Sequence, residues 1–579
     1  MKTTTAILPL FLLYLSTLLP AQCVEDWVAA QTSPSEVFPW ELEFDAEGNL
    51  YLALAGKQAL EVLDAMGGGI DLQSGSLEAM TVVAKYSPAG KLLWATPFFG
   101  HASVAINPAL AVSYDRVYLW SGFRDTLQVE EEVLTSDAFG LQMFGAALKL
   151  DGTLDWVRTF PTTGISLAYG MTIDQAGKLL VTGYFSGTVQ LTSSGQGLIS
   201  QSINSSFPRE VFVLKLHQNG DVIWFSQSQS PVAQDQYNRG WPIVVDGNND
   251  VIVGGYYSTQ IRWGATEVIP PTPYPALQPY IAKLDGDDGH LLWLRHGANT
   301  QGDVSFSAIY GLAVGPNNEI YAAGSLESEA AFDGVVVTPD DDGSPDALLL
   351  KYSQDGNLQW AKVFGGLSED CVTEWATGIH YRPGGTLRVV ANLCDSIPVP
   401  GGFVRAIGSP DVAVADFNLN GDLLDLYLAG SRGPDASYNS GFDSEGNFAL
   451  IASVNGDTVF FPDLAVVLDP PVGQQAVVYR ECVFPVRLQE AGAGFSRPVL
   501  WPNPTDRMVT VDFGEEQFLS RWRLLNALGQ TVCSGKFEPG LQRSEWELSW
   551  EPLPGGWYLL ELELEGLGAL ALPLILHPG

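Results

Sequence analysis

The sequence predicts an all-β protein: a seven-bladed β-propeller closed by its N-terminal strand, followed by a small C-terminal β-sandwich. Tryptophans recur every 62 to 69 residues, at positions 27, 94, 156, 224, 293 and 360, and Asp425 takes the seventh position. Each follows a turn rich in Gly, Asn or Asp, and a second hairpin pattern lies upstream of each repeat. A steady period with variable loops is typical of repeat architectures. Four strands in each repeat are typical of propeller blades.

The upstream hairpins give the number of blades. In WELEFDAEGNLYLALAG, residues 40–56, apolar residues alternate on both sides of an Asp-Ala-Glu-Gly turn. This alternation around residues that tolerate positive φ is the short-range signal of a β-hairpin. Equivalent hairpins begin near Trp40, Ala109, Tyr169, Trp241, Tyr310, Thr377 and Tyr438. Seven copies predict seven blades, and we place the propeller at residues 22–486.

The last blade lacks a strand at its C-terminal end. Its third strand is expected at residues 476–483, and no fourth strand follows. The segment VEDWVAAQ, around Trp27, carries the fourth-strand pattern but precedes the first blade. We therefore expect the N-terminal strand to complete the last blade, because ring closure removes the exposed sheet edges that an open array would present.

The cysteines fit this closure. Cys23 and Cys482 fall at the two positions that bracket the hairpin turn in the other repeats, so we expect a disulfide between them. Cys371 and Cys394 flank one hairpin and are predicted to pair at its open end. Cys533 is left unpaired. Export favours the oxidised form of such pairs.

The N-terminus looks like a secretory signal peptide over residues 1–21. Lys2 precedes an apolar core at residues 6–19, which is too short for a comfortable membrane span. Cleavage before Gln22 is favoured, and a lipoprotein signal at Cys23 is the alternative. No later stretch is long and apolar enough to span a bilayer, so we expect an exported chain that passes through the periplasm.

Composition limits the partners. The 579 residues contain 29 Lys and Arg against 66 Asp and Glu, a net charge of −37. Contacts to phosphate need a basic surface, so this charge opposes binding to nucleic acid or to anionic lipid. We expect an extracellular carbohydrate or protein as ligand, and a monomer.

The repeat around Trp360 resembles a known family. In DALLLKYSQDGNLQWAKVFGG, residues 346–366, the pattern resembles the SBBP repeat (seven-bladed β-propeller repeat) of exported bacterial proteins. The matching residues are Asp346, Ala347, Lys351, Tyr352, Gly356, Asn357, Leu358, Trp360, Gly365 and Gly366. The resemblance covers roughly residues 24–483 and implies the propeller fold without naming a ligand.

The pattern changes after a short linker at residues 487–497. Residues 498–579 contain several short strands, which predict the β-sandwich. Three blocks resemble the type A sorting domain of Bacteroidetes type IX secretion, with Pro502, Asn503, Pro504, Gly529, Gly556 and Tyr558 at the matching positions. The resemblance implies the type IX secretion machinery as partner and delivery to the cell surface or the medium. The chain ends in ALPLILHPG rather than in a basic strand, so anchoring and cleavage stay open.

No catalytic, metal or cofactor site is predicted. The repeated tryptophan resembles the docking pattern of quinone-dependent propeller dehydrogenases, and Ser353–Gly356 resembles a sialidase Asp box with its glycine one residue early. Residues 416–422, DFNLNGD, begin like an EF-hand loop. Counted from Asp416, however, the twelfth residue is Tyr427, where an EF-hand requires Glu. Residues 285–289 are expected to be a solvated turn. Packing between blades is the simpler role for the tryptophans.

The expected ligand face follows from the loop lengths. The connections from strand two to strand three, and from one blade to the next, are long and variable, and binding residues favour such loops. The candidates there are Tyr237, Arg239, Trp241, Glu374 and Trp375, with blade packing as the alternative role of the two tryptophans. The sequence favours a non-catalytic binding or adhesion protein. The alternative is a secreted glycan-directed hydrolase of sialidase type.

Overall fold

The computed structural model describes residues 26–482 and 499–576 with gaps. The gaps are at 34–36, 76, 78, 101–107, 137–139, 192–198, 203–208, 230–236, 259, 269–276, 301–304, 340–344, 367–373, 400–401, 409, 457, 462–463, 468–474, 502–507, 526–530, 537–541, 550–555 and 565–567. The chain divides into two units, Met1–Val483 and Phe484–Gly579. The predicted signal peptide and linker, with Cys23, Cys371, Pro502, Asn503, Pro504 and Gly529, lie outside the described residues.

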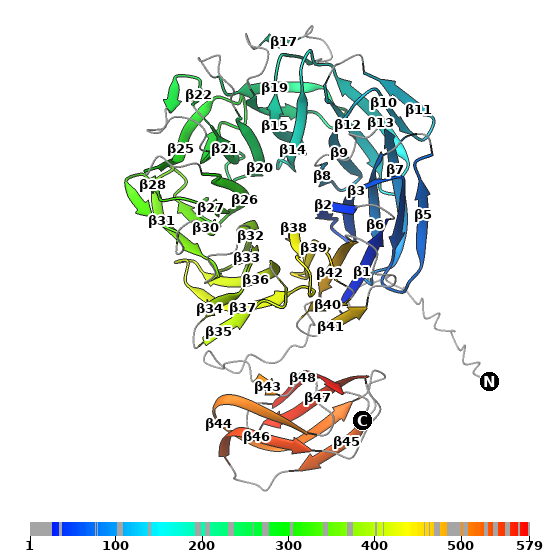
Figure 1. The fold of residues 1–579 in the computed structure, drawn as a ribbon, viewed down its shortest axis with the longest axis vertical. Coiled ribbons are helices and arrows are strands. Elements are labelled where there is room, and N and C mark those ends of the chain that lie inside the picture. The colour runs from blue at the N-terminus through cyan, green and yellow to red at the C-terminus, as the bar shows by residue number, and fades with distance from the viewer. Residues whose placement is uncertain are drawn as a thin grey trace, which may run out of the picture. The chain divides into compact units, whose positions relative to one another are not determined.

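The first unit is a ring of seven antiparallel sheets (Figure 1). The first three blades are β2 (Val37–Phe44), β3 (Leu50–Lys57), β6 (Ala79–Tyr86) and β7 (Leu92–Gly100); β8 (Ala109–Val112), β9 (Arg116–Phe123), β12 (Gln142–Lys149) and β13 (Leu154–Phe160); and β14 (Ser166–Ile173), β15 (Leu179–Phe185), β18 (Glu210–Leu216) and β19 (Val222–Gln227). In each blade the first strand lies nearest the centre of the ring. The seven-bladed all-β prediction is confirmed.

The next three blades repeat this order. They are β20 (Arg239–Val245), β21 (Val251–Tyr257), β24 (Gln278–Leu284) and β25 (Leu291–Asn299); β26 (Ala308–Val314), β27 (Ile320–Leu326), β30 (Asp346–Tyr352) and β31 (Leu358–Phe364); and β32 (Trp375–Arg382), β33 (Thr386–Leu393), β36 (Asp411–Asn418) and β37 (Leu423–Ala429). The second and third strands of the blades are buried along most of their length, so the core lies between neighbouring sheets.

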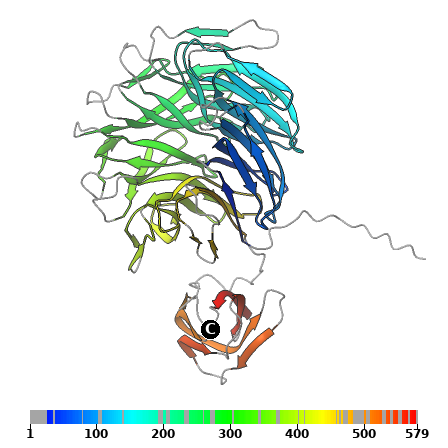
Figure 2. The same ribbon diagram turned by 45° about the vertical axis from the view of Figure 1, so that its right-hand side comes forward.

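The seventh blade takes its outer strand from the other end of the chain. It contains β38 (Ala436–Phe442), β39 (Phe448–Val454), β42 (Gln475–Glu481) and β1 (Trp27–Thr32), in that order. Strands β1 and β42 are antiparallel, with Trp27 opposite Arg480 and Gln31 opposite Ala476. Figure 2 shows the blue N-terminal strands beside the gold strands of this blade.

Every connection from strand two to strand three carries its own hairpin. The seven are β4 (Ala59–Leu63) with β5 (Gly69–Gln73), β10 (Thr126–Val129) with β11 (Glu132–Thr135), β16 (Thr188–Leu191) with β17 (Ile199–Ser202), β22 (Ile261–Trp263) with β23 (Thr266–Val268), β28 (Ala330–Phe332) with β29 (Val335–Val337), β34 (Ser396–Val399) with β35 (Gly402–Arg405), and β40 (Thr458–Phe461) with β41 (Leu464–Val467).

Three of these hairpins pair with the outer strand of the preceding blade, and three more bridge to a residue just beyond it. Strands β4, β10 and β28 pair with β1, β7 and β25, and single bridges join Thr162 to Val189, Gln229 to Arg262 and Gly430 to Phe460. We expected these long connections to form a ligand face. Strands β4, β10 and β28 cover backbone groups of the outer strands that would otherwise be an open sheet edge, and the ligand face stays a prediction.

Buried ion pairs fix the inner hairpins. Asp174 in blade three accepts a hydrogen bond from the Lys178 backbone at 2.7 Å and contacts Lys215 Nζ at 2.8 Å. A buried carboxylate needs this full pairing, because an unpaired charge in the interior is costly. The same arrangement recurs as Asp45 with Lys85, Asp246 with Lys283 and Asp443 with Arg480. The basic residue on strand three is therefore a structural element of the repeat.

The repeated tryptophans join each blade to the next. Trp293 Nε1 donates a hydrogen bond to the Gln354 carbonyl at 3.1 Å, across 61 positions in the chain. A side chain added at Gly356, which has φ of 76°, would lie 2.7 Å from that ring. Trp27, Trp94, Trp156, Trp224 and Trp360 make the equivalent bonds to Pro88, Leu150, Gln218, Gly286 and Leu419. The expected packing between blades is confirmed for all six tryptophans.

The described part of the second unit contains six strands. They are β43 (Val499–Trp501), β44 (Met508–Leu525), β45 (Thr531–Lys536), β46 (Gln542–Ser549), β47 (Gly556–Leu564) and β48 (Gly568–Leu576). The long β44 pairs with β43 and β46 through its first half and with β45 and β47 through its second. One strand therefore contributes to two sets of pairings, which ties the unit together.

Candidate functional site

The inner strands of the propeller surround a central cavity of about 630 Å³. Strands β2, β14, β20, β26, β32 and β38 contribute most of its wall (Figure 1). A concave site with a few converging polar groups on a rigid frame is where ligands most often bind in proteins. This cavity is therefore the first candidate site.

Aromatic side chains line the cavity because of a repeated backbone irregularity. In five inner strands the register shifts at an aromatic residue: at Trp40, Tyr169, Tyr310 or Tyr438 alone, and in β20 across Trp241 together with Pro242. A β-bulge inserts one residue and redirects its side chain. All five residues line the cavity, and Thr377 occupies the equivalent bulge in the sixth blade.

Neighbouring blades bring these rings into contact. Trp40 and Tyr438 meet edge to face with ring centroids 5.0 Å apart, and Trp241 meets Tyr310 edge to face at 5.3 Å. Tyr169 lies 5.0 Å from Trp241. In the sequence, each of these five aromatic residues lies five positions before the first residue of its hairpin turn. The loop lengths that predict the ligand face do not reveal this position.

Two glutamates on β2 also line the cavity. Glu41 accepts a hydrogen bond from the Asn439 amide, and burial together with the charge of Glu43 raises the pKa of Glu41 well above its ordinary value. Burial raises the pKa of Glu43 to about 7. The protonated form of Glu41 is therefore favoured relative to an exposed glutamate, and Glu43 is divided between its two forms near neutral pH. Neither glutamate is among the site residues predicted from the sequence.

His380 lies on the same wall. Its Nε2 is 2.8 Å from Ser440 Oγ. Burial, with the charge of Arg388 added, lowers the pKa of His380 to about 4, so the ring is neutral at physiological pH. His380 therefore contributes a neutral polar group to the cavity wall.

Two of the predicted ligand-face residues, Arg239 and Trp241, come together beside this cavity. The guanidinium carbon of Arg239 lies 4.6 Å from the ring centre of Tyr169 and 5.6 Å from that of Trp241, and both rings line the cavity. Tyr237 is 38% exposed, and its ring centre lies 4.9 Å from the guanidinium carbon of Arg209. Arg209 is not among the residues predicted from the sequence.

The other two predicted residues separate. Trp375 lines the central cavity. Glu374 is only 1% exposed, and its carboxylate accepts hydrogen bonds from the Gly366 and Cys394 backbone amides, at 3.0 Å and 2.7 Å. These contacts give Glu374 a structural role.

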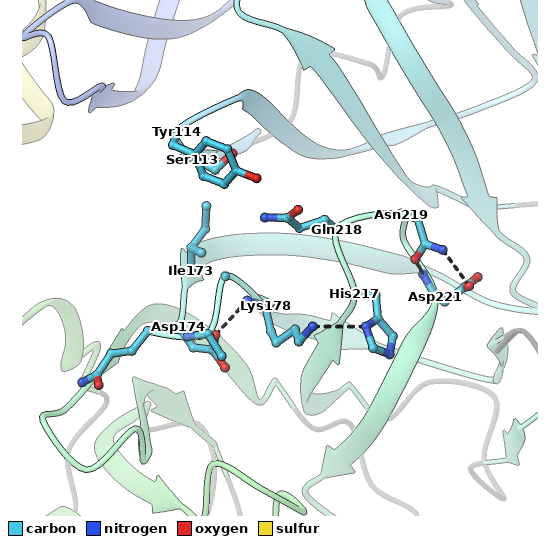
Figure 3. A pocket seen from close by; sticks show the side chains of 12 residues that line it. Ser113, Tyr114, Ile173, Asp174, Lys178, His217, Gln218, Asn219 and Asp221 are labelled. Carbon is cyan, nitrogen blue, oxygen red and sulfur yellow. Dashed lines mark hydrogen bonds between the residues drawn. The ribbon is translucent and has the colours of Figure 1, made fainter.

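A second hollow of about 850 Å³ lies between tight hairpin turns of blades two and three. Figure 3 shows Tyr114 and Ser113 on one side and Lys178 and His217 on the other. Lys178 Nζ lies 3.3 Å from His217 Nδ1, while the Asp221 carboxylate accepts from the Asn219 amide at 2.9 Å. Several of its polar groups thus already bind one another.

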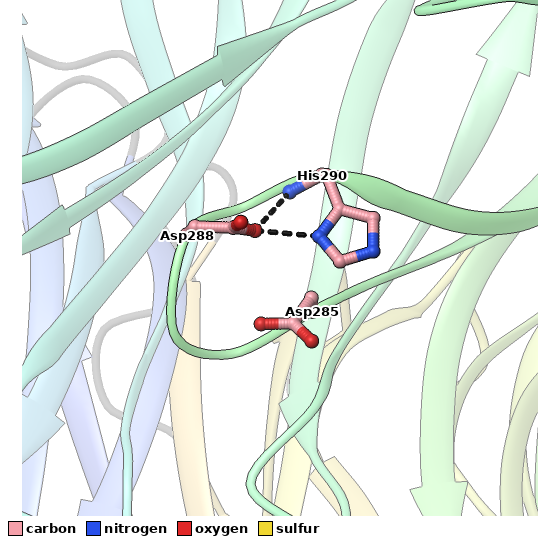
Figure 4. Close-up of side chains that lie close together, drawn as sticks. All are labelled: Asp285, Asp288 and His290. Carbon is pink, nitrogen blue, oxygen red and sulfur yellow. Dashed lines mark hydrogen bonds and ion pairs between the residues drawn. The ribbon is translucent and has the colours of Figure 1, made fainter.

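One turn brings together three side chains of the types that bind metal ions. Asp285, Asp288 and His290 place their ligand atoms within 4.8 Å of one another (Figure 4). Asp288 Oδ1 accepts from the His290 backbone at 3.0 Å and lies 2.6 Å from His290 Nδ1, a bond that raises the pKa of His290. Hydrogen bonds within the turn account for this arrangement, and we assign no metal to it.

Comparison with known proteins identifies the C-terminal unit. Residues 499–568 match the family described as the secretion system C-terminal sorting domain. The chain is accordingly secreted to the cell surface or the medium. Among the described residues, no helix is long and apolar enough to cross a membrane.

The remaining similarities are distant. An uncharacterised WD repeat-containing protein of Acanthamoeba polyphaga mimivirus is 22% identical over 214 residues, which are 34% of this chain and 15% of that protein. Among solved structures, a luciferin-regenerating enzyme has a TM-score of 0.31 at 10% identity, covering 79% of this chain and 96% of its own. A gluconolactonase from Xanthomonas campestris has a TM-score of 0.25 at 12% identity, covering 64% and 94%.

Proposed function

We propose that this protein is an exported, non-catalytic binding or adhesion protein that holds a carbohydrate at the aromatic wall of its central cavity. The observation that supports this most directly is the set of five bulged aromatic residues that share one wall. Aromatic rings offer large apolar faces at little cost in conformational entropy, and their polar edges can also bind hydroxyl groups.

Binding to a glycan array tests this proposal. The secreted protein should bind defined glycans, and Trp241→Ala and Tyr438→Ala should each weaken binding by about tenfold or more, the scale expected when a stacked ring is lost. Tyr114→Ala is the matched control, because Tyr114 is an 81% exposed aromatic residue that is not among the residues lining the cavity. Equal binding by all three variants would contradict the proposal.

A glycan-directed hydrolase is the second candidate. Its support is the pair Glu41 and Glu43, whose raised pKa values suit a carboxylic acid that donates a proton near neutral pH. Their spacing of two residues on one strand puts both side chains on one face. A screen for released reducing ends should detect hydrolysis that Glu43→Gln abolishes. Tight binding without turnover would leave the first candidate.

We also infer that β1 and two disulfides hold the ring closed. Among the described cysteines only Cys533 is free, and Cys394 and Cys482 are buried and disulfide-bonded. Asp26 Oδ1 accepts a hydrogen bond from the Cys482 backbone at 2.7 Å, which holds the residue before β1 beside the end of β42. Cys23 and Cys371 are the partners we propose.

The signal peptide, the SBBP repeat type, the sandwich form of the tail and the monomeric state stay predictions.

A further inference from the structure

We infer that Arg209 and Arg239 form a subsite for an acidic sugar, one that carries a carboxylate or sulfate group. This inference rests on the proposed function and specifies its ligand class. The subsite lies between blades three and four, at the ends of β14, β15, β18, β20 and β21. It adjoins the central cavity, because Arg239 stacks on Tyr169 and Trp241, which line that cavity.

Aromatic rings enclose both guanidinium groups. Arg239 lies 5.2 Å from the ring of Tyr184 and 5.4 Å from that of Tyr256, in addition to its two cavity contacts. Arg209 lies 4.9 Å from the rings of Tyr184 and Tyr237. Tyr184 therefore lies beside both arginines and fixes their spacing. Stacking of this kind holds a guanidinium in place before a ligand arrives.

These two arginines differ from every other ring-stacked arginine that the structure describes. The others each meet a carboxylate: Arg158 with Asp221, Arg295 with Asp333, Arg382 and Arg388 with Asp416, and Arg480 with Asp443. Neither Arg209 nor Arg239 forms an ion pair with a described carboxylate. In a chain of net charge −37, two neighbouring cations without such partners point to an anionic ligand.

The geometry suits an oxyanion on a ring. A guanidinium that stacks through its face keeps its N–H edge available, and that edge matches the two oxygens of a carboxylate. The adjacent exposed face of Tyr237 and the cavity face of Trp241 can receive the sugar ring. The charge-assisted hydrogen bonds from the guanidinium groups then favour acidic over neutral sugars, while stacking on Tyr237 and Trp241 adds contact area.

Calorimetric titration of the secreted full chain with matched hexasaccharides tests this inference. The probes are a hexamer of galacturonate, a sulfated hexamer and neutral cellohexaose. An acidic hexamer should bind at least about tenfold more tightly than cellohexaose, as expected when a charge-assisted hydrogen bond is gained. The two acidic arms show whether carboxylate or sulfate is preferred. High salt should remove the preference.

Three variants locate the effect. Arg239→Gln and Arg209→Gln should each lower affinity for the acidic hexamer by about tenfold more than they lower affinity for cellohexaose. Arg295→Gln is the matched control, because Arg295 also stacks on a tryptophan, Trp293, at 5.7 Å, but lies near the tight turns. Melting temperatures check the folding of each variant, and the salt dependence of the wild type provides a measurement that needs no variant.

Equal affinity for acidic and neutral hexamers would overturn the subsite while leaving the proposed function in place. An acidic preference that both Arg→Gln variants retain would also overturn it. Tighter binding of hexa-aspartate than of either acidic sugar would replace the sugar with an acidic peptide. Failure of all hexamers to bind, together with no effect of Trp241→Ala on the glycan array, would overturn the proposed function as well.

Discussion

The indole nitrogen of Trp27 donates a hydrogen bond to the carbonyl of Pro88 at 3.0 Å, so the N-terminal strand contacts the first blade from its place in the seventh. The same ring packs against Gly90, where an added side chain would lie 2.7 to 2.8 Å from Trp27 and Ala65 atoms. Asp425 takes the equivalent position in blade six. The next blade in the ring joins β42 and β1 from the two ends of the chain, so no continuous hairpin turn connects its last two strands.

Replacing Trp27 should loosen the ring. Trp27→Phe keeps much of the packing but loses the bond to Pro88, and should lower the free energy of unfolding by about 1 kcal/mol. Trp27→Ala should lower it by about 3–5 kcal/mol, because it leaves a cavity at the buried interface. Chemical denaturation measures both. Exposed Leu93→Ala is the control, and a Trp27→Ala variant as stable as that control would contradict the interpretation.

Turn glycines should differ according to what faces them. Gly356 and Gly446 both have positive φ, at 76° and 87°, so alanine is strained at either position by about 1–2 kcal/mol. An added side chain would lie 2.7 Å from Trp293 at Gly356 but would meet nothing within 4 Å at Gly446. Gly356→Ala should therefore cost about 1–3 kcal/mol more than Gly446→Ala in the free energy of unfolding. Equal costs would show that the indole can move aside.

Stability should depend on pH through Glu43. Burial raises its pKa from about 4.5 to about 7, so the folded state binds the proton more tightly than the unfolded state. Its contribution to the free energy of unfolding is full below pH 4.5 and is lost as the pH rises through 7. Glu43→Gln should lose less stability than the wild type between pH 5 and pH 8, by up to about 3 kcal/mol.

The control for this pH series is exposed Glu47→Gln, which should follow the wild type. His380 acts in the opposite direction between about pH 4 and 6.5, because its pKa is lowered, so the difference between wild type and Glu43→Gln is the quantity to measure. Parallel curves for the wild type and Glu43→Gln would show that Glu43 does not change its proton affinity on folding.

Peptide mapping of the non-reduced protein should recover two disulfide-linked pairs, Cys23 with Cys482 and Cys371 with Cys394. A bond that joins the two ends of the propeller closes a very long loop, so Cys482→Ser should lower stability by about 4 kcal/mol in the loop-entropy model. Cys533→Ser is the control, since Cys533 is free. Peptides that link Cys23 to any other cysteine would exclude the proposed closure.

Deleting residues 498–579 should stop secretion. The deleted segment contains residues 499–568, which match the sorting domain, so the propeller should collect in the periplasm. Immunoblots of periplasm and medium measure this, with a periplasmic enzyme as lysis marker. Attaching the same segment to an unrelated periplasmic protein should lead to its release. Normal secretion of the truncated chain would contradict the assignment.

The propeller could be predicted from sequence because its causes are local and repeated. Alternation of apolar residues sets each hairpin, and the glycine of each turn allows a backbone that other residues adopt with strain. The period then gives the number of blades. The sequence also predicts Arg239, Trp241 and Tyr237 on the face of the propeller that carries the long connections, because the order of strands decides which strand ends lie on each face.

The tertiary structure alone decided the candidate site. Trp40, Tyr169, Tyr310 and Tyr438 were visible as hairpin starts, but only the bulges turn them into one wall. Glu41 and Glu43 read as ordinary strand residues until blade packing buries them and raises their pKa values. Glu374 looked like a loop carboxylate and is instead enclosed by backbone amides. Sequence fixes the period of a repeat, whereas the burial and pairing of these side chains depend on neighbours that only folding brings together: Asn439, which bonds Glu41, lies 398 positions away in the chain.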